Sequence, residues 1–191
     1  MEATEFRRAS HAVWESMAAG WDERHAYLEE TARPVTERML ERLAPARGQT
    51  ILDLAAGTGV AGFAAAALVG SDGRAIVSDF SAAMVEAAKR HAGELAIKNV
   101  ECRVLDAERL DLPNEAVDGV LCRWGYMLMA DPRQRSRRRA ERCGVADAFP
   151  APFSRDRSRP VGGAAVARAP GARARTAAAA RCPRDPRARR P

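Results

Sequence analysis

Long apolar runs and metal-binding cysteine patterns are both missing from this chain. No stretch reaches the roughly 18 uninterrupted apolar residues that a membrane-spanning helix needs, and the first residues lack the apolar core of a secretion signal. The four cysteines form no C-x-x-C pair and have no histidine at ligand spacing, which argues against a zinc site and a disulfide framework. The sequence therefore predicts a soluble, cytoplasmic protein that holds no metal.

Basic charge is unevenly distributed over the 191 residues. The formal net charge is +6, yet residues 1–132 carry −7 and residues 133–191 carry +13. The second segment has 17 arginines but no lysine, leucine, isoleucine, methionine, tryptophan or tyrosine. With so few large apolar side chains to bury, it cannot offset the entropy cost of ordering. We expect residues 133–191 to form a disordered tail rich in Arg, Ala and Pro.

A helical pattern fills residues 1–45. Apolar side chains recur there at spacings of four, four and seven, at Val13, Met17, Trp21 and Leu28. Pro34 is expected to open a further segment that ends near Leu43. The pattern predicts two or three amphipathic helices that form an N-terminal helical cap.

Strand and helix signals alternate through residues 46–132. Short apolar runs predict strands over 50–55, 75–79, 100–105 and 117–122, and helices are predicted over 60–69 and 81–93. Ser81 is a suitable N-cap for the second helix, and Gly93 a suitable stop. Such alternation indicates βαβ units, a parallel sheet and right-handed crossovers. The predicted fold class is α/β, a Rossmann-like three-layer domain with four parallel strands.

A glycine-rich turn follows the first predicted strand. It reads Gly57-x-Gly59-x-x-Gly62, and Asp79 lies 22 residues beyond Gly57, near the end of the next strand. In open α/β sheets, ligands bind at this carboxyl edge of the strands. Taken alone, the pattern fits a dinucleotide and other adenosyl ligands equally, with Asp79 accepting the ribose hydroxyls of either.

The charge of Asp53 separates these ligands. This acid lies four residues before Gly57, where the pyrophosphate of a dinucleotide would be repelled by a carboxylate. S-adenosylmethionine brings a sulfonium and an ammonium group to the same place, so Asp53 favours that ligand. At the end of the third strand, Asp106 could accept a hydrogen bond from the adenine amine, or could simply start a turn.

The chain resembles the class I S-adenosylmethionine-dependent methyltransferases, particularly the ubiquinone and menaquinone C-methyltransferase group, a methyltransferase type 11 domain. The resemblance covers about Trp14 to Pro132. It rests on four motifs in the same order: ILDLAAGTG at 51–59, SDFS at 78–81 with Met84, DAE at 106–108 with LP at 112–113, and VDGV at 117–120.

The resemblance implies a cofactor-binding domain over residues 46–132, with S-adenosylmethionine as cofactor and a small molecule as methyl acceptor. The implied cofactor-binding residues are Asp53, Ala55, Gly57, Thr58 and Gly59 for the methionine part, Asp79 for the ribose, Phe80, Met84, Asp106 and Ala107 for the adenine, and Arg123 beside the methyl donor. Ala55 departs from the glycine usual at the third position of the family's turn, and we expect it to narrow the turn slightly.

No catalytic side chain is predicted, because methyl transfer is an in-line displacement in which the enzyme contributes mainly proximity and orientation. His25 could approach a substrate from the cap but is interpreted as a surface histidine, and His91 is interpreted as a partner of a helix C-terminus. Trp14, Trp21 and Tyr27 could line an acceptor pocket or could serve packing. The residues do not specify the acceptor, the methylated atom or the oligomeric state.

The family pattern continues after Pro132 with a helix and further strands, for which residues 133–191 show no signal. Regrouping possible codons from Arg133 onward yields a helix-like sequence ending in Gly-Gly, which suggests a frame-shifted or truncated reading of a longer methyltransferase. Loss of those strands would expose one side of the sheet and impair cofactor binding, activity and stability.

Two alternative functions stay open at this point. The arginine-rich tail could bind nucleic acid through phosphate contacts, although Phe149 and Phe153 are its only aromatic residues and base stacking needs such rings. An NAD-dependent oxidoreductase is the third possibility, since the glycine pattern alone allows it.

Overall fold

Two long helices begin the computed structural model, which describes residues 2–113, 116–130 and 164–168. Helix α1 spans Ala3–Glu23 and α2 spans His25–Leu43, with Arg24 between them. The expected break at Pro34 is wrong, because Pro34 lies inside α2. Its ring faces solvent, so the helix loses one backbone hydrogen bond there without disturbing a packed surface.

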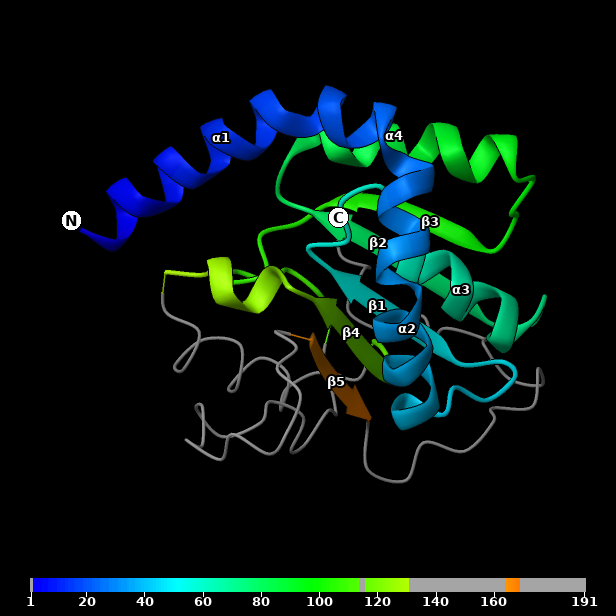
Figure 1. Ribbon diagram of the computed structural model, residues 1–191. Helices are drawn as coiled ribbons and strands as arrows, with labels where there is room; N and C mark the ends of the chain where they lie inside the picture. Colours follow the sequence, from blue (N-terminus) through cyan, green and yellow to red (C-terminus); the bar gives the residue numbers. More distant parts are fainter. Residues whose placement is uncertain (1, 114–115, 131–163, 169–191) are drawn as a thin grey trace, which may run out of the picture.

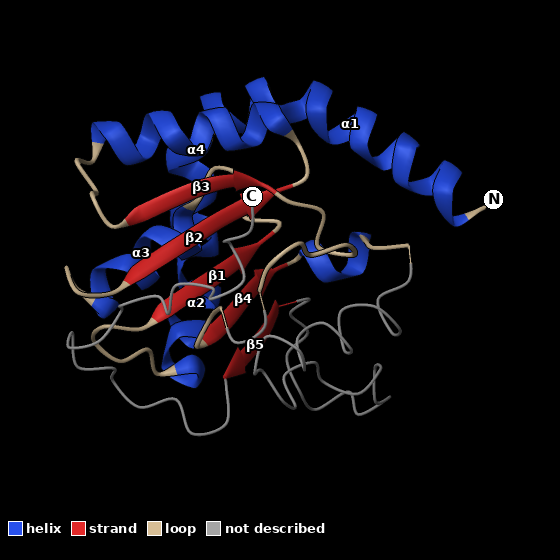
Figure 2. Cartoon of the chain, turned by 180° about the vertical axis from the view of Figure 1, so that it is seen from behind, coloured by secondary structure: helices blue, strands red, loops and turns tan. Residues whose placement is uncertain are grey.

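A sheet forms the centre of the molecule, and its strand order is β3-β2-β1-β4-β5 (Figure 2). The four predicted parallel strands are confirmed as β1 Thr50–Leu54, β2 Arg74–Asp79, β3 Val100–Val104 and β4 Gly119–Arg123. The order reverses between β1 and β4, because β2 and β3 lie on one side of β1 and β4 on the other. This reversal marks the ligand-binding crevice of open α/β sheets.

Helices cover one face of this sheet. Helix α3 spans Val60–Val69 and α4 spans Ala82–Glu94, and both lie with α2 on the same side of the strands (Figures 1 and 2). The Ser81 hydroxyl accepts a hydrogen bond from the backbone N–H of Met84 at 3.1 Å, which confirms the predicted N-cap. Because side chains alternate along a strand, Ile51 and Leu121 pack against Leu43 and Val69 of the helices.

The opposite face is covered by irregular chain. Leu52, Ile76 and Val120 point to this side and pack against Leu110 and Val117 from the segment that leads to β4. Each of these sheet residues is at most 5% exposed. The expectation that one side of the core would be exposed is therefore wrong for these residues, because residues 105–113 and 116–117 supply apolar side chains that pack against them.

The tail contributes one described strand. Strand β5, Ala164–Arg168, pairs antiparallel with β4, in a segment for which the sequence predicts no element. Backbone pairing is largely independent of side-chain type, and the edge of β4 offers unpaired N–H and C=O groups. The rest of the predicted disordered tail, and the frame-shift hypothesis with it, falls on residues 133–163 and 169–191, outside the described part.

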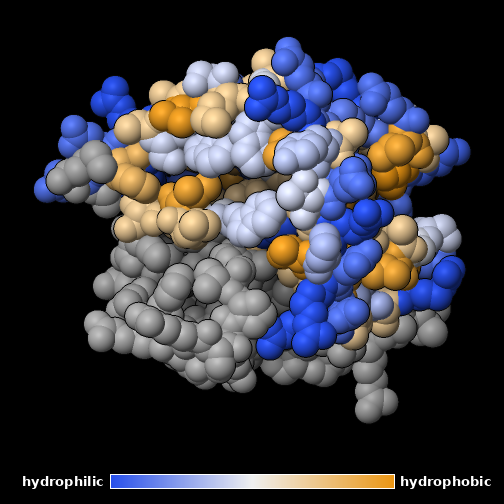
Figure 3. All heavy atoms as spheres, in the orientation of Figure 1, coloured by the Kyte–Doolittle hydropathy of each residue, from blue (hydrophilic) through white to orange (hydrophobic). Residues whose placement is uncertain are grey.

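Helix α1 lies over α4, and its first half extends past the carboxyl edge of the strands (Figure 1). Among its described side chains, Ala18 is the one that is buried. Apolar residues on this side of the molecule form several small patches separated by polar ones (Figure 3). No described helix combines the length and apolarity that a bilayer crossing requires.

Polar contacts fix α1 in place. Glu15 Oε1 accepts a hydrogen bond from the backbone N–H of Ala83 at the start of α4. Near the other end of α1, Asp22 pairs with Arg90 and with His91 of α4. At the free end, Arg7 Nε lies 2.8 Å from Glu108 Oε2, and both side chains are largely shielded from solvent.

Candidate functional site

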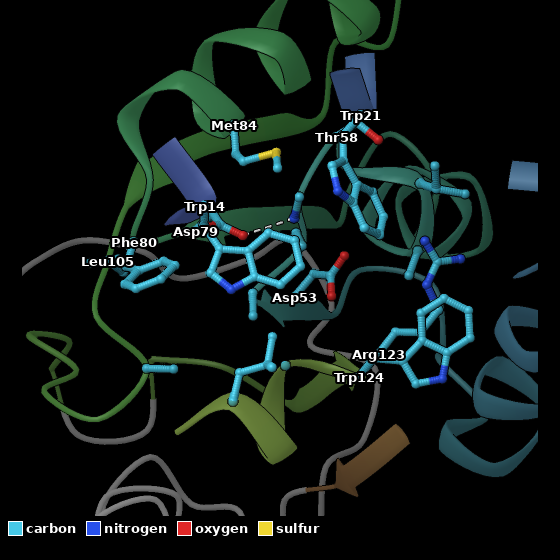
Figure 4. Close-up of a pocket in the computed structure, with 18 of the residues that line it drawn as sticks. Trp14, Trp21, Asp53, Thr58, Asp79, Phe80, Met84, Leu105, Arg123 and Trp124 are labelled. Atoms are coloured by element: carbon cyan, nitrogen blue, oxygen red, sulfur yellow. Dashed lines mark hydrogen bonds between the residues drawn. The ribbon is translucent and has the colours of Figure 1, made fainter. Parts of the chain in front are cut away.

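A pocket opens at the carboxyl edge of β1, β2 and β4, beneath α1 (Figure 4). Ten of the eleven predicted site residues line it: Asp53, Ala55, Gly57, Thr58, Asp79, Phe80, Met84, Asp106, Ala107 and Arg123. The other wall residues include Trp14, Trp21, Leu28, Leu105, Trp124 and Leu128. The structure thus brings together side chains from helices α1, α2 and α4, strands β1, β2 and β4, and the adjoining loops around one hollow.

Asp53 is the most unusual group in this pocket. It lies near the end of β1, is 1% exposed, and neither carboxylate oxygen has a hydrogen-bond partner among the described residues. Burial raises the pKa of Asp53 to about 7, although the nearby Arg123 guanidinium acts in the opposite direction. A buried carboxylate without donors is costly, so the site is suited to a cationic ligand group.

The turn after β1 is held in a left-handed conformation. Gly57 has φ 56° and Gly59 has φ 95°, values that glycine adopts without the strain other residues incur. Gly59 is the predicted residue that does not line the pocket. A Cβ there would lie 2.5 Å from the Phe63 ring, so Gly59 serves the turn and the close start of α3.

Ala55 also has a positive φ, 51°, a conformation that costs a side-chain-bearing residue of the order of 1 kcal/mol. Its methyl group occupies the space in front of Gly125, where a Cβ would lie 2.2 Å from Ala55 Cβ. The alanine therefore packs directly against the Gly125 backbone, where a side chain at position 125 would clash with it.

Asp79 ties the turn to the next helix. Its Oδ2 accepts a hydrogen bond from the backbone N–H of Gly57 at 2.9 Å, and its Oδ1 accepts one from Ser81 at 3.0 Å. Burial raises the pKa of Asp79, and these backbone donors act against that rise. Each carboxylate oxygen has a second lone pair, so the group can still accept hydrogen bonds from a ligand in the pocket.

Asp106 starts a turn, as one interpretation of the sequence predicts, and it also lines the pocket. Its Oδ1 accepts a hydrogen bond from the backbone N–H of Glu108 at 2.8 Å, which makes it a turn residue. It also lines the pocket together with Phe80, Met84 and Ala107. Phe80 in turn contacts the edge of the His11 ring, with 5.3 Å between the ring centroids. This end of the pocket is flat-sided and mainly apolar, with one carboxylate at its border.

Arg123 and Trp124 form the opposite end of the pocket. Arg123 Nη1 donates a hydrogen bond to Thr36 Oγ1 of α2 at 2.7 Å, and its guanidinium carbon lies 5.2 Å from the Trp124 ring centroid, within cation–π range. Burial lowers the pKa of Arg123, and Asp53 opposes that shift. Trp124 has φ 64°, a strained backbone of the kind that collects at functional sites.

The aromatic residues of the cap divide between two roles. Trp14 and Trp21, whose ring centroids are 5.6 Å apart, both line the pocket from α1. Tyr27 is 68% exposed and lies outside it. The spacing of Trp14 and Trp21 indicates this shared position, because two residues seven apart lie on the same helix face. Nothing in the sequence distinguishes Leu28, Leu105 and Leu128 from core residues.

His25, expected at the surface, lies against the glycine turn and stacks on His91. His25 Nδ1 is 2.8 Å from Thr58 Oγ1, and its ring stacks on that of His91 with 3.8 Å between centroids. His25 is a partly buried residue, so its interpretation as a surface histidine is wrong. The two residues are 66 positions apart, and no local pattern could have paired them.

Comparison with known proteins finds a matching family and several similar sequences. A model of a methyltransferase domain family matches residues 45–144. Aklanonic acid methyltransferase DauC of Streptomyces sp. (strain C5) is 31% identical over 98 residues, which are 51% of this chain and 44% of that protein. The ubiquinone/menaquinone biosynthesis C-methyltransferase UbiE of Coxiella burnetii (strain Dugway 5J108-111) is 37% identical over 79 residues, 41% of this chain and 32% of that protein.

A solved structure agrees with the fold. The crystal structure of an S-adenosylmethionine-dependent methyltransferase from Aquifex aeolicus superposes with a TM-score of 0.53 at 24% identity, over 58% of this chain and 60% of that one. This likeness concerns the fold alone. The chain spans less than half the length of the two curated relatives named above.

Proposed function

The chain belongs to the methyltransferase domain family, and from that premise we propose that it binds S-adenosylmethionine in the pocket and transfers the methyl group to a small-molecule acceptor. One observation carries the proposal. The buried Asp53 carboxylate has no donor among the described residues, yet it lies where the family motif receives the cationic end of this cofactor. An ammonium group supplies both the charge and the donors that this carboxylate lacks.

The remaining pocket residues fit the rest of the cofactor. Asp79 has spare acceptor capacity for ribose hydroxyls beside the glycine turn that it already orders. Phe80, Met84 and Ala107 offer an apolar slot for a flat base, and Asp106 lies at its edge. A dinucleotide fits less well, since its pyrophosphate would meet Asp53 at the turn.

The cofactor, when bound, supplies an activated methyl group for in-line displacement. The chain's part is then to orient and to exclude water. Trp14 and Trp21 provide an apolar wall from α1, and Trp124 with Leu128 provides another from the segment after β4. An acceptor enclosed between such walls would be a small organic molecule, in keeping with the substrates in the relatives' names.

Titration calorimetry with S-adenosylhomocysteine and with NAD tests this proposal. We expect binding of the first at pH 7.5 and none of the second. Replacing Asp53 by Asn should weaken S-adenosylhomocysteine binding about 100-fold, because the charge partner of the ammonium is removed. Asp72→Asn is the matched control, since Asp72 is exposed in the loop before β2, and it should bind like the unmodified chain. Equal binding of NAD, or unchanged affinity in the Asp53 variant, would contradict the assignment.

A further inference from the structure

His25 connects helices α1, α2 and α4 with the glycine turn that follows β1. It is the first residue of α2, its Nδ1 is 2.8 Å from Thr58 Oγ1, and its ring stacks on His91 of α4 at an interplanar angle of 12°. His91 then connects to α1, because its Nε2 is 2.7 Å from Asp22 Oδ1. Thr58 follows Gly57 directly and lines the pocket, so this series of contacts leads from the cap into the ligand-binding turn.

We propose that His25 is a positioning residue that holds Thr58 and the glycine turn in their binding geometry while its ring is neutral, which makes cofactor affinity fall as the solution is acidified. The inference rests on the proposed function, because it concerns the same pocket. His25 does not line the pocket, and it acts on the ligand through Thr58.

The surrounding carboxylates lie closer to His91 than to His25. The two ring nitrogens of His91 each face a carboxylate, Asp22 at 2.7 Å and Glu94 at 3.3 Å. His25 has one carboxylate within 4 Å, at Glu29, and the 3.7 Å separation there is longer than a hydrogen bond. Arg90 is the remaining charged group nearby, and it pairs with Asp22.

If both rings of the His25–His91 stack carried a proton, two cations would face each other. The ring centroids are 3.8 Å apart, where like charges repel strongly at the partial burial of this site. Burial and the charge of His91 both lower the pKa of His25, while the nearby carboxylates of Glu29, Asp22 and Glu94 act in the opposite direction. The neutral form of His25 therefore extends below the pH at which a free histidine gains its proton.

Protonation of His25 would act on the turn in two ways. A neutral Nδ1 can accept the Thr58 hydroxyl proton, whereas a protonated ring can only donate, so the hydroxyl would have to turn away. The added positive charge would also stand beside a turn that receives a cationic ligand group. Both effects have the same sign, and because the pKa of His25 is lowered they weaken binding at pH values below the ordinary histidine midpoint of about 6.5.

Asp53 complicates the pH profile, because its pKa of about 7 means that it too must release a proton to bind an ammonium group. The test therefore compares how steeply the dissociation constant changes with pH in the unmodified protein and in a variant of His25. We expect the dissociation constant of S-adenosylhomocysteine, measured by calorimetry on the full chain, to rise about threefold more between pH 7.5 and 5.5 in the unmodified protein than in His25→Gln. Glutamine can still bond with Thr58 but does not titrate in this range. Arg33→Gln, an exposed charge in the same helix, should retain the full slope.

The outcomes separate the two proposals. Equal slopes in His25→Gln and the unmodified chain would overturn the positioning role and leave cofactor binding intact. No binding of S-adenosylhomocysteine by the unmodified chain at pH 7.5 would overturn the proposed function and this inference with it. If His25→Gln does not fold, histidine ring NMR on the unmodified chain decides instead. The ring with contacts to the Thr58 methyl group should then titrate at lower pH when ligand is added, and an unchanged midpoint would refute the inference.

Discussion

The sheet and the α1 cap are stabilised by different interactions. In the sheet, Ile51, Leu52 and Leu121 are completely buried, and clusters of apolar side chains fill both faces. Helix α1 is attached through charged and polar contacts, while Val13 and Met17 on it stay about half exposed. We therefore expect the separation of α1 from α4 to cost less free energy than a disruption of the sheet core.

The difference between the sheet and α1 also concerns the two walls of the pocket. The sheet presents Asp53, Asp79 and the glycine turn from rigid strand ends, and α1 places Trp14 and Trp21 over the same pocket. A ligand would meet fixed polar groups on one wall and a detachable apolar wall on the other. The predictions below test whether the two regions respond independently.

The largest effect is expected from the sheet. Leu52→Ala removes a side chain that is 0% exposed and should lower the free energy of unfolding by about 3 kcal/mol, because it leaves a cavity in the core. Urea unfolding monitored by circular dichroism measures this loss. Leu68→Ala is the control, since Leu68 in α3 is 48% exposed and should lose less than about 0.5 kcal/mol. Similar losses in both variants would contradict the assigned core.

An intermediate effect of opposite sign is expected at Asp53. Its folded pKa of about 7 exceeds the ordinary aspartate value of 3.8, so the folded state binds the proton more tightly and loses stability as pH rises from about 4 to 7. Asp53→Asn should therefore stabilise the ligand-free protein by about 2 kcal/mol at pH 8. At pH 3.5, where Asp53 is protonated in the folded state and mostly protonated in the unfolded state, the variant should gain little.

Thermal melts at the two pH values check this prediction, with Asp72→Asn as the control in which an exposed carboxylate is removed. A gain of equal size at both pH values would mean that the charge of Asp53 is not the cause. A gain at pH 8 alone, together with the loss of ligand binding expected for the same variant, would show that Asp53 lowers the stability of the ligand-free protein and is needed for ligand binding.

The smallest effect is expected in the cap. Asp22→Asn removes the carboxylate that pairs with both Arg90 and His91. Because Asp22 is partly exposed, its pairs are worth only about 1 kcal/mol, so amide exchange in α1 should quicken about fivefold while exchange in β1 and β2 stays unchanged. Hydrogen exchange with mass spectrometry resolves the two regions. Glu23→Gln, an adjacent exposed acid, should leave both rates as they are. Equal acceleration in α1 and the strands would show one cooperative unit.

Local signals in the sequence were sufficient for the four parallel strands and most of the pocket. The run Ile51–Leu54 followed by a glycine turn specifies a strand and the start of a helix within a few residues, and Ser81 specifies its helix start in the same way. Backbone propensity and capping act over such short distances, so these features are readable without the fold. The family resemblance is confirmed by the family model over residues 45–144.

What the sequence did not reveal depends on contacts between distant residues. His25 and His91 meet because α2 begins beside α4, and Arg7 meets Glu108 across 101 positions. Pro34 usually ends a helix, but packing of Met39 and Leu43 against the sheet retains α2 on both sides of it. Strand β5 follows from the open edge of β4 rather than from its own residues, which are mostly alanine.

The contact between Ala55 and Gly125 limits how this pocket can change through evolution. The two positions share room for one methyl group, since a second Cβ would lie 2.2 Å from the first. A side chain at 125 becomes acceptable after Ala55 has mutated to glycine, and the reverse order passes through a clash. Positions 55 and 125 should therefore covary among homologues, with at most one of them bearing a side chain, and the order of the two mutations is fixed by sterics.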